Sequence, residues 1–104
     1  LPRLTASTVK ELVRLKEMLP TDTPFTVMVA PTRFEIRDGT PVFEKLRRTI
    51  VEELLKRGIP AVDPFAPFKA AGFGPTHFRH DGHWSALGHK IAADAIARHI
   101  KMNN

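Results

Sequence analysis

The sequence predicts a partial, doubly wound α/β domain with three layers (α/β/α) and parallel strands. Two short apolar runs, at residues 25–30 and 59–63, have the composition of strands. The segment between them, residues 40–58, carries apolar side chains at the spacing of an amphipathic helix. A strand, a helix and a second strand over about 40 residues form a βαβ unit, which is right-handed and has parallel strands.

The first element is expected to be a helix that begins at Ser7 or Thr8 and ends at Leu19. Either hydroxyl can act as the N-cap, and Glu11 follows Thr8 at the spacing of a capping box. Pro20 then ends the helix, because proline lacks the N–H that a further turn needs.

Two strands are expected next. Residues 25–30 are β-branched and almost wholly apolar, which is typical of a parallel strand covered on both faces. Residues 33–37 alternate between polar and apolar, which predicts a short edge strand, and Asp38 and Gly39 end it.

The helix over residues 40–58 has the clearest boundaries. Thr40 is expected as its N-cap, Pro41 at its first position and Gly58 at its end. The strand at 59–63 follows it directly.

The rest of the chain is expected to be one long loop followed by a helix. Residues 64–84 are rich in proline and glycine, and a loop of about twenty residues is uncommon unless it is functional or disordered. Ser85 then caps a final helix to about His99. Because two or three strands make a poor sheet alone, residues 1–104 are expected to form a single partial domain, the second half of a flavodoxin-like fold.

Composition excludes several classes of function. Hydrophobic residues make up 42% of the chain and charged residues 26%, as in soluble globular proteins, and no apolar run is long enough for a membrane span. The absence of cysteine excludes disulfides, thiolate zinc sites and a cysteine nucleophile.

The net charge is +5, but no nucleic-acid recognition motif accompanies it, so nucleic acid is not predicted as a partner. The densest basic cluster shares its helix with glutamates and is expected on a solvated face; it consists of Lys45, Arg47, Arg48, Lys56 and Arg57.

The candidate chemistry lies in the predicted loop, where His77, His80 and His83 fall within seven residues, with Asp81 among them. In an extended stretch, side chains two positions apart point the same way, so Asp81 and His83 are expected on one side. A carboxylate beside one imidazole nitrogen leaves the other free to act as general base for a hydroxyl nucleophile. Trp84 is expected to wedge into the protein and fix the turn.

Two alternatives from other classes remain open. A non-catalytic α/β binding or interaction module would leave Asp81 and His83 solvated, as a local hydrogen bond. A zinc-binding domain would bring several histidines and Asp81 to one point. The spacings match no helical His-x-x-x-His pair, so no metal or other cofactor is predicted. The candidate ligands are His77, His80, Asp81, His83 and His89.

Residues 81–84 (Asp-Gly-His-Trp), followed by Gly88 and His89 and an alanine-rich helix, resemble the last conserved block of SGNH/GDSL hydrolases. A single residue between Asp and His, followed by Trp, is more similar to the branch of polysaccharide O-acetyltransferases. The resemblance implies the C-terminal half of an SGNH-hydrolase-like domain and an acyl ester or acylated carbohydrate as substrate. It also implies catalytic roles for Asp81 and His83, and it favours an extracytoplasmic location. Arg33 and Trp84 are further candidates for contacting the substrate.

The chain departs from this family pattern at the nucleophile. The family's serine lies in a Gly-Asp-Ser block near the N-terminus, and later blocks supply a Gly and an Asn to the oxyanion hole; this sequence has neither. Its two serines, Ser7 and Ser85, are both expected at helix starts. The chain is therefore expected to be a fragment, inactive alone, whose partner is the missing N-terminal half of the same domain.

Overall fold

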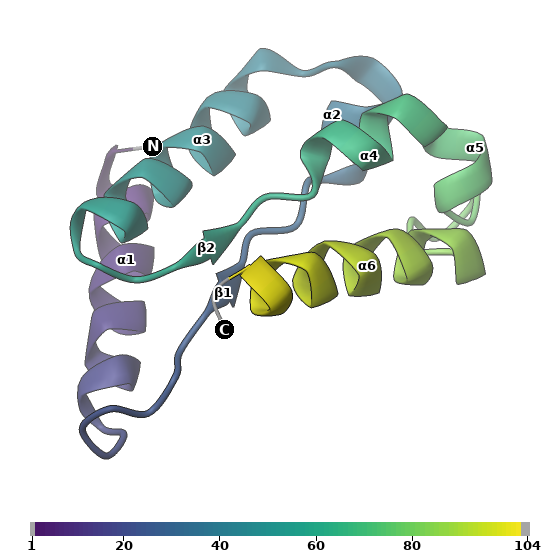
Figure 1. The fold of residues 1–104 in the computed structure, drawn as a ribbon. Coiled ribbons are helices and arrows are strands. Elements are labelled where there is room, and N and C mark those ends of the chain that lie inside the picture. The colour runs from purple at the N-terminus through teal and green to yellow at the C-terminus, as the bar shows by residue number, and fades with distance from the viewer. Residues whose placement is uncertain (1, 103–104) are drawn as a thin grey trace.

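The computed structural model describes residues 2–102, which fold into helices around one small sheet (Figure 1). No helix within these residues is both long and apolar enough to cross a membrane. In chain order the elements are α1 (Pro2–Glu17), β1 (Val27–Met28), α2 (Arg33–Asp38), α3 (Pro41–Lys56), β2 (Ala61–Val62), α4 (Phe65–Ala71), α5 (Phe73–Thr76) and α6 (Ala86–Met102).

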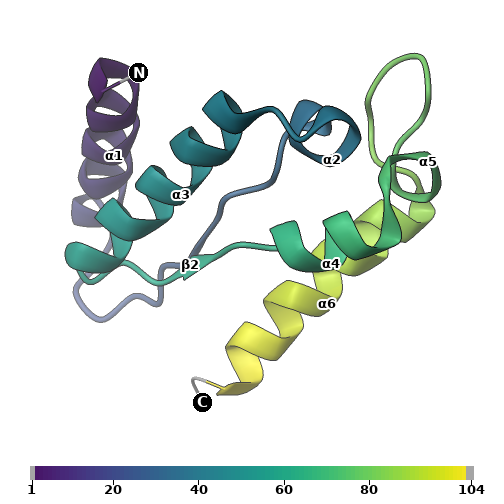
Figure 2. The same ribbon diagram turned by 90° about the horizontal axis from the view of Figure 1, so that it is seen from above.

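The sheet consists of β1 and β2, which pair in parallel as the βαβ pattern predicts. Val27 lies opposite Ala61, and Met28 lies opposite Val62. Both strands are shorter than predicted, at two residues each. In both views β2 lies between α3 and α6 (Figures 1 and 2). The result is mostly helical and has the character of a partial α/β unit, but two strands do not establish a flavodoxin-like strand order.

Two apolar clusters make up the core. One is built on Val9, Leu54 and Ile59 and holds α1 and α3 against the sheet. The other is built around Phe68, which is fully buried, with Ile36 of α2 and Ala92 of α6. The second cluster lies under the segment that carries the candidate site, and therefore anchors it.

The first helix begins earlier than predicted, at Pro2, and ends at Glu17. Pro2 is its first residue, where a missing N–H costs no helical hydrogen bond. Ser7 and Thr8 therefore lie inside the helix, and the predicted capping box at Thr8 is wrong.

The predicted edge strand at 33–37 is wrong, because these residues form α2. Thr32 caps this helix: the Glu35 N–H donates to Thr32 Oγ1 at 3.2 Å, and the Thr32 N–H donates to Glu35 Oε2 at 2.9 Å. Gly39, in the left-handed region with φ 64°, closes the other end. The capping box and the C-terminal glycine favour a helix more strongly than a short polar–apolar alternation favours a strand.

Helix α3 confirms its predicted start, with Thr40 as N-cap and Pro41 at the first position. The Thr40 hydroxyl does not cap the helix; it donates to the Phe34 carbonyl at 3.3 Å and so ties α3 to α2. The helix ends at Lys56, and Gly58 follows with φ 72°.

The predicted loop at 64–84 is only partly a loop, since it contains α4 and α5. Pro67 and Pro75 indicated broken structure, but each lies in the first turn of its helix, where proline is tolerated. Ser85 precedes α6 as predicted, and that helix continues past His99 to Met102.

Candidate active site

The segment between α5 and α6 is a tight hairpin, residues 77–84, that projects from one end of the molecule (Figure 2). His77 and Trp84 form an antiparallel bridge at its base. The Phe78 N–H donates to the His83 carbonyl at 2.7 Å, and the Gly82 N–H donates to the Phe78 carbonyl at 3.1 Å. These bonds close the hairpin on itself.

Trp84 anchors the base of this hairpin, as predicted. Its ring packs on Phe68, with centroids 5.3 Å apart, and meets His89 edge-on at 5.4 Å. Helix α6 starts close beside it: a Cβ added to Gly88 would lie 2.9 Å from the Trp84 Cβ and nearer still to the Thr76 carbonyl oxygen. Only glycine therefore fits at position 88 without moving the hairpin base.

Asp81 and His83 lie together, as the spacing predicts. Asp81 Oδ1 is 3.3 Å from His83 Nδ1, and the same oxygen accepts the His83 backbone N–H at 3.0 Å. The side chains are 58% and 80% exposed, respectively. The predicted extended backbone is wrong, because Gly82 has φ 71° and the residues form a turn. The turn, rather than strand alternation, brings the two side chains to one side.

The electrostatics of this pair favour an ionised carboxylate. The His83 backbone N–H holds the pKa of the Asp81 carboxyl below its ordinary value of 3.8. Desolvation, the next largest cause, opposes this lowering of the pKa, whereas the His83 imidazole and, less strongly, Arg33 add to it. Asp81 is therefore charged at neutral pH and can orient the imidazole through Nδ1. Among residues 2–102, no hydrogen-bond partner occupies Nε2, the nitrogen on the opposite side of the ring. A carboxylate-oriented imidazole of this kind can act as a general base.

Arg33 reaches the hairpin from α2, 48 residues earlier in the chain. Its Nη1 donates to the Asp81 backbone carbonyl at 3.2 Å. Its Cδ lies 2.6 Å from the position that a Gly82 Cβ would occupy, and its guanidinium lies above the Phe34 ring at 4.9 Å from the centroid. Arg33 thus contacts the backbone that carries the pair.

The other histidines of the segment do not join the pair. His77 is 4% exposed, stacks on Phe73 with centroids 5.2 Å apart, and places Nδ1 2.9 Å from Thr76 Oγ1. Burial lowers the pKa of His77 below its ordinary value of 6.5, with a smaller contribution from Arg33. His80 is exposed at the hairpin tip. Within the part of the chain that is described, no three His, Asp or Glu side chains are placed to hold a metal ion, so the zinc alternative finds no ligand set.

A buried ionic network centred on Arg47 contacts α2, and we did not predict it from the sequence. Arg47 was expected on a solvated face but is 5% exposed. Its Nε donates to Glu35 Oε1 at 2.8 Å, and its Nη1 pairs with Asp63, the residue after β2. The guanidinium also lies over the Phe65 ring, 4.2 Å from the centroid. The network ties α2 to α3 and to the carboxyl end of β2.

A signal for this burial does exist in the sequence. Arg47 lies four residues after Phe43 and three before Ile50, inside the apolar stripe of its helix. A charged residue at such a position indicates a buried partner. The pattern does not reveal that the partners are Glu35 and Asp63.

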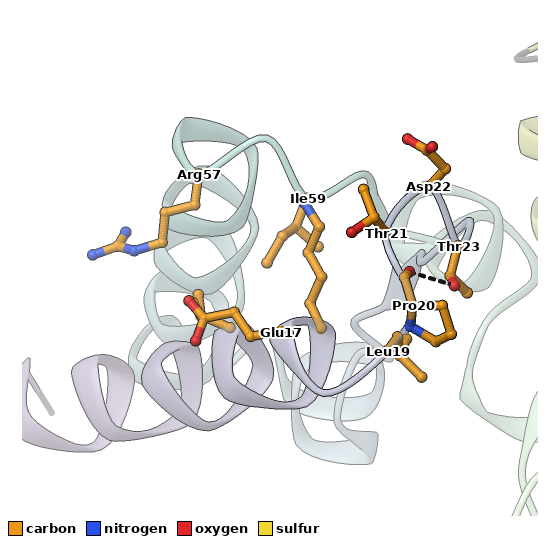
Figure 3. Close-up of a pocket in the computed structure, with 10 residues that line it drawn as sticks. Glu17, Leu19, Pro20, Thr21, Asp22, Thr23, Arg57 and Ile59 are labelled. Atoms are coloured by element: carbon orange, nitrogen blue, oxygen red, sulfur yellow. Dashed lines mark hydrogen bonds between the residues drawn. The ribbon is translucent and has the colours of Figure 1, made fainter.

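A pocket of about 590 Å³ lies at the other end of the molecule, where α1 meets the turn that follows it (Figure 3). Glu17, Asp22, Arg57 and Ile59 are among its lining residues, and none of its residues belongs to the hairpin. Pocket volume and candidate chemistry therefore point to different places. We assign the candidate site to the hairpin, because a paired carboxylate and imidazole have a defined chemical capacity.

In a comparison with known families, the family described as SGNH hydrolase-like domain, acetyltransferase AlgX, matches residues 14–104. The match includes the hairpin, Arg33 and the buried network. No curated protein and no solved structure matched the chain. Membership supports a function related to acyl transfer or ester hydrolysis. The chain belongs to the SGNH hydrolase-like, acetyltransferase AlgX domain family.

Proposed function

We propose that Asp81 and His83 supply the acid–base half of a Ser-His-Asp triad that transfers an acyl group. The acyl donor is an ester such as an acylated carbohydrate, and the acceptor is water or a sugar hydroxyl. The observation that carries this proposal is the 3.3 Å approach of Asp81 Oδ1 to His83 Nδ1, which leaves Nε2 for the nucleophile. Hydrogen bonds of catalytic groups are often this long in the free enzyme.

The chemistry follows from this arrangement. His83 Nε2 takes the proton of the serine hydroxyl while the serine oxygen attacks the ester carbonyl. The resulting imidazolium, oriented by ionised Asp81, gives that proton to the departing alcohol, and an acyl-serine remains. Nε2 then deprotonates the acceptor hydroxyl as it attacks the acyl-serine, and the serine oxygen regains a proton as it leaves.

The serine and the oxyanion donors come, in this proposal, from a segment outside residues 1–104. Ser7 lies within α1. The Ser85 hydroxyl donates to the Pro75 carbonyl at 2.6 Å and accepts the Gly88 N–H at 3.3 Å, so it serves as the α6 cap. The 80% exposure of His83 supports a site that another segment covers.

A fluorophosphonate probe tests the proposal, because it reacts with serines that a neighbouring base activates. In the full-length protein that contains this chain, we expect labelling of one serine, located by mass spectrometry. His83→Ala should abolish the labelling, and His80→Ala should not, since His80 is exposed in the same hairpin but is not paired with Asp81. Absence of labelling would favour a non-catalytic module instead. Equal labelling of His83→Ala would mean that a group other than His83 activates the serine, which contradicts the proposal.

A further inference from the structure

We propose that Arg33 is a positioning residue, whose guanidinium fixes the turn that presents Asp81 and His83. This inference rests on the proposed function, since it assigns Arg33 a role in that chemistry. It replaces the expectation that Arg33 contacts the substrate. The observation that supports it is that the Arg33 guanidinium, which comes from α2, contacts the backbone of residues 81 and 82.

The tip of the hairpin needs such a support because the contacts of Trp84 anchor the base of the hairpin and not its tip. The bonds between Phe78 and residues 82 and 83 close the loop on itself, and the two reactive side chains are largely exposed. The hydrogen bond from Arg33 Nη1 to the Asp81 carbonyl, at 3.2 Å, joins the turn to a separate element of the fold. It therefore restrains how the turn sits relative to the domain.

Arg33 lies at the start of a helix that several contacts hold in place. It is the first residue of α2, which the reciprocal Thr32 and Glu35 hydrogen bonds cap. Glu35 is 1% exposed and is held by Arg47 through a 2.8 Å hydrogen bond. The Phe34 ring lies beneath the guanidinium. A planar, always-charged group on so constrained a helix start is well suited to hold a carbonyl in place.

Gly82 makes the contact possible in two ways. Its φ of 71° produces the turn, and the absence of a Cβ leaves room for the Arg33 side chain, whose Cδ would lie only 2.6 Å from such an atom. Any larger residue at position 82 would push the guanidinium off the turn.

Removing the Arg33 side chain is expected to slow the chemical step of the reaction. Misplacing a reacting group by about 1 Å can cost about 100-fold in rate. We therefore expect Arg33→Ala to lower kcat by about 10- to 100-fold through the altered position of His83. KM should change by less than about twofold, because the substrate's ground-state contacts are retained.

The experiment measures acetyl-ester hydrolysis by the full-length protein with Arg33→Ala and, as the matched control, Arg37→Ala. Arg37 lies one turn further along α2 and pairs with Asp38 instead. Guanidinium ion at millimolar concentration should restore part of the activity of Arg33→Ala, which a general loss of structure would not allow. An unchanged kcat overturns the inference, as does a raised KM with unchanged kcat, the result expected of a substrate contact. A loss of kcat without guanidinium rescue also overturns it.

His83→Ala, assayed in parallel, separates the two proposals. If His83→Ala retains full activity, the proposed function fails, and the role of Arg33 fails with it. If His83→Ala is inactive while Arg33→Ala matches the wild type, only the positioning role fails.

Discussion

Replacing His83 with alanine should lower kcat for acetyl-ester hydrolysis by the full-length protein by about 10⁶-fold, the scale of base removal in serine triads. Without Nε2 the serine keeps its proton, and without an imidazolium the departing alcohol receives none. KM should change little, because the imidazole acts mainly in the transition state. The measurement is steady-state kinetics with a chromogenic acetyl ester.

His80→Ala is the matched control for this experiment. His80 lies three residues earlier in the same exposed hairpin, and we assign it no part in the chemistry. Its replacement should leave kcat within about twofold of the wild type. If His83→Ala lowers kcat by less than about tenfold, another group is the base.

Replacing Arg47 with alanine should lower the free energy of unfolding by about 3–5 kcal/mol, because it leaves a buried charge without its partner. Glu35 is 1% exposed, and Arg47 is the side chain that neutralises it in the structure. Because Glu35 also accepts the Thr32 N–H, the capping of α2 should weaken in the same variant. Urea denaturation of the full-length protein, followed by circular dichroism, measures the change.

Arg48 provides the control, since it neighbours Arg47 on α3 but is 64% exposed and approaches Glu44 only to 3.6 Å. Arg48→Ala should change the free energy of unfolding by no more than about 0.5 kcal/mol. A double variant, Glu35→Gln with Arg47→Met, should be less destabilised than Arg47→Ala, since it removes both charges of the buried pair. If Arg47→Ala is as stable as Arg48→Ala, the network does not hold α2.

The fold could be predicted where local signals agree with each other. Pro41 and Gly58 bound α3 as expected, and the two apolar segments on either side pair in parallel. Helix α2 was missed because a five-residue segment with apolar residues at Phe34 and Ile36 fits strand alternation as well as a short helix. The capping box at Thr32 and Glu35 was the stronger signal.

The site could be predicted only as far as its residues are close in sequence. The proximity of Asp81 and His83 follows from their spacing, although a Gly82 turn rather than an extended strand produces it. The Arg33 contact spans 48 residues, and the Arg47 pair joins separate elements. Such contacts depend on how helices pack, which hydrophobic periodicity does not specify.

The central claim is that Asp81 and His83 act as one unit, and a double-mutant comparison of kcat tests it most directly. Asp81→Asn keeps the side-chain shape but removes the charge, and should lower kcat by about 10⁴-fold. Introduced into His83→Ala, the same change should cause no further loss, because the carboxylate acts only through the imidazole. Losses that multiply in the double variant, or an Asp81→Asn protein with wild-type kcat, would contradict the claim.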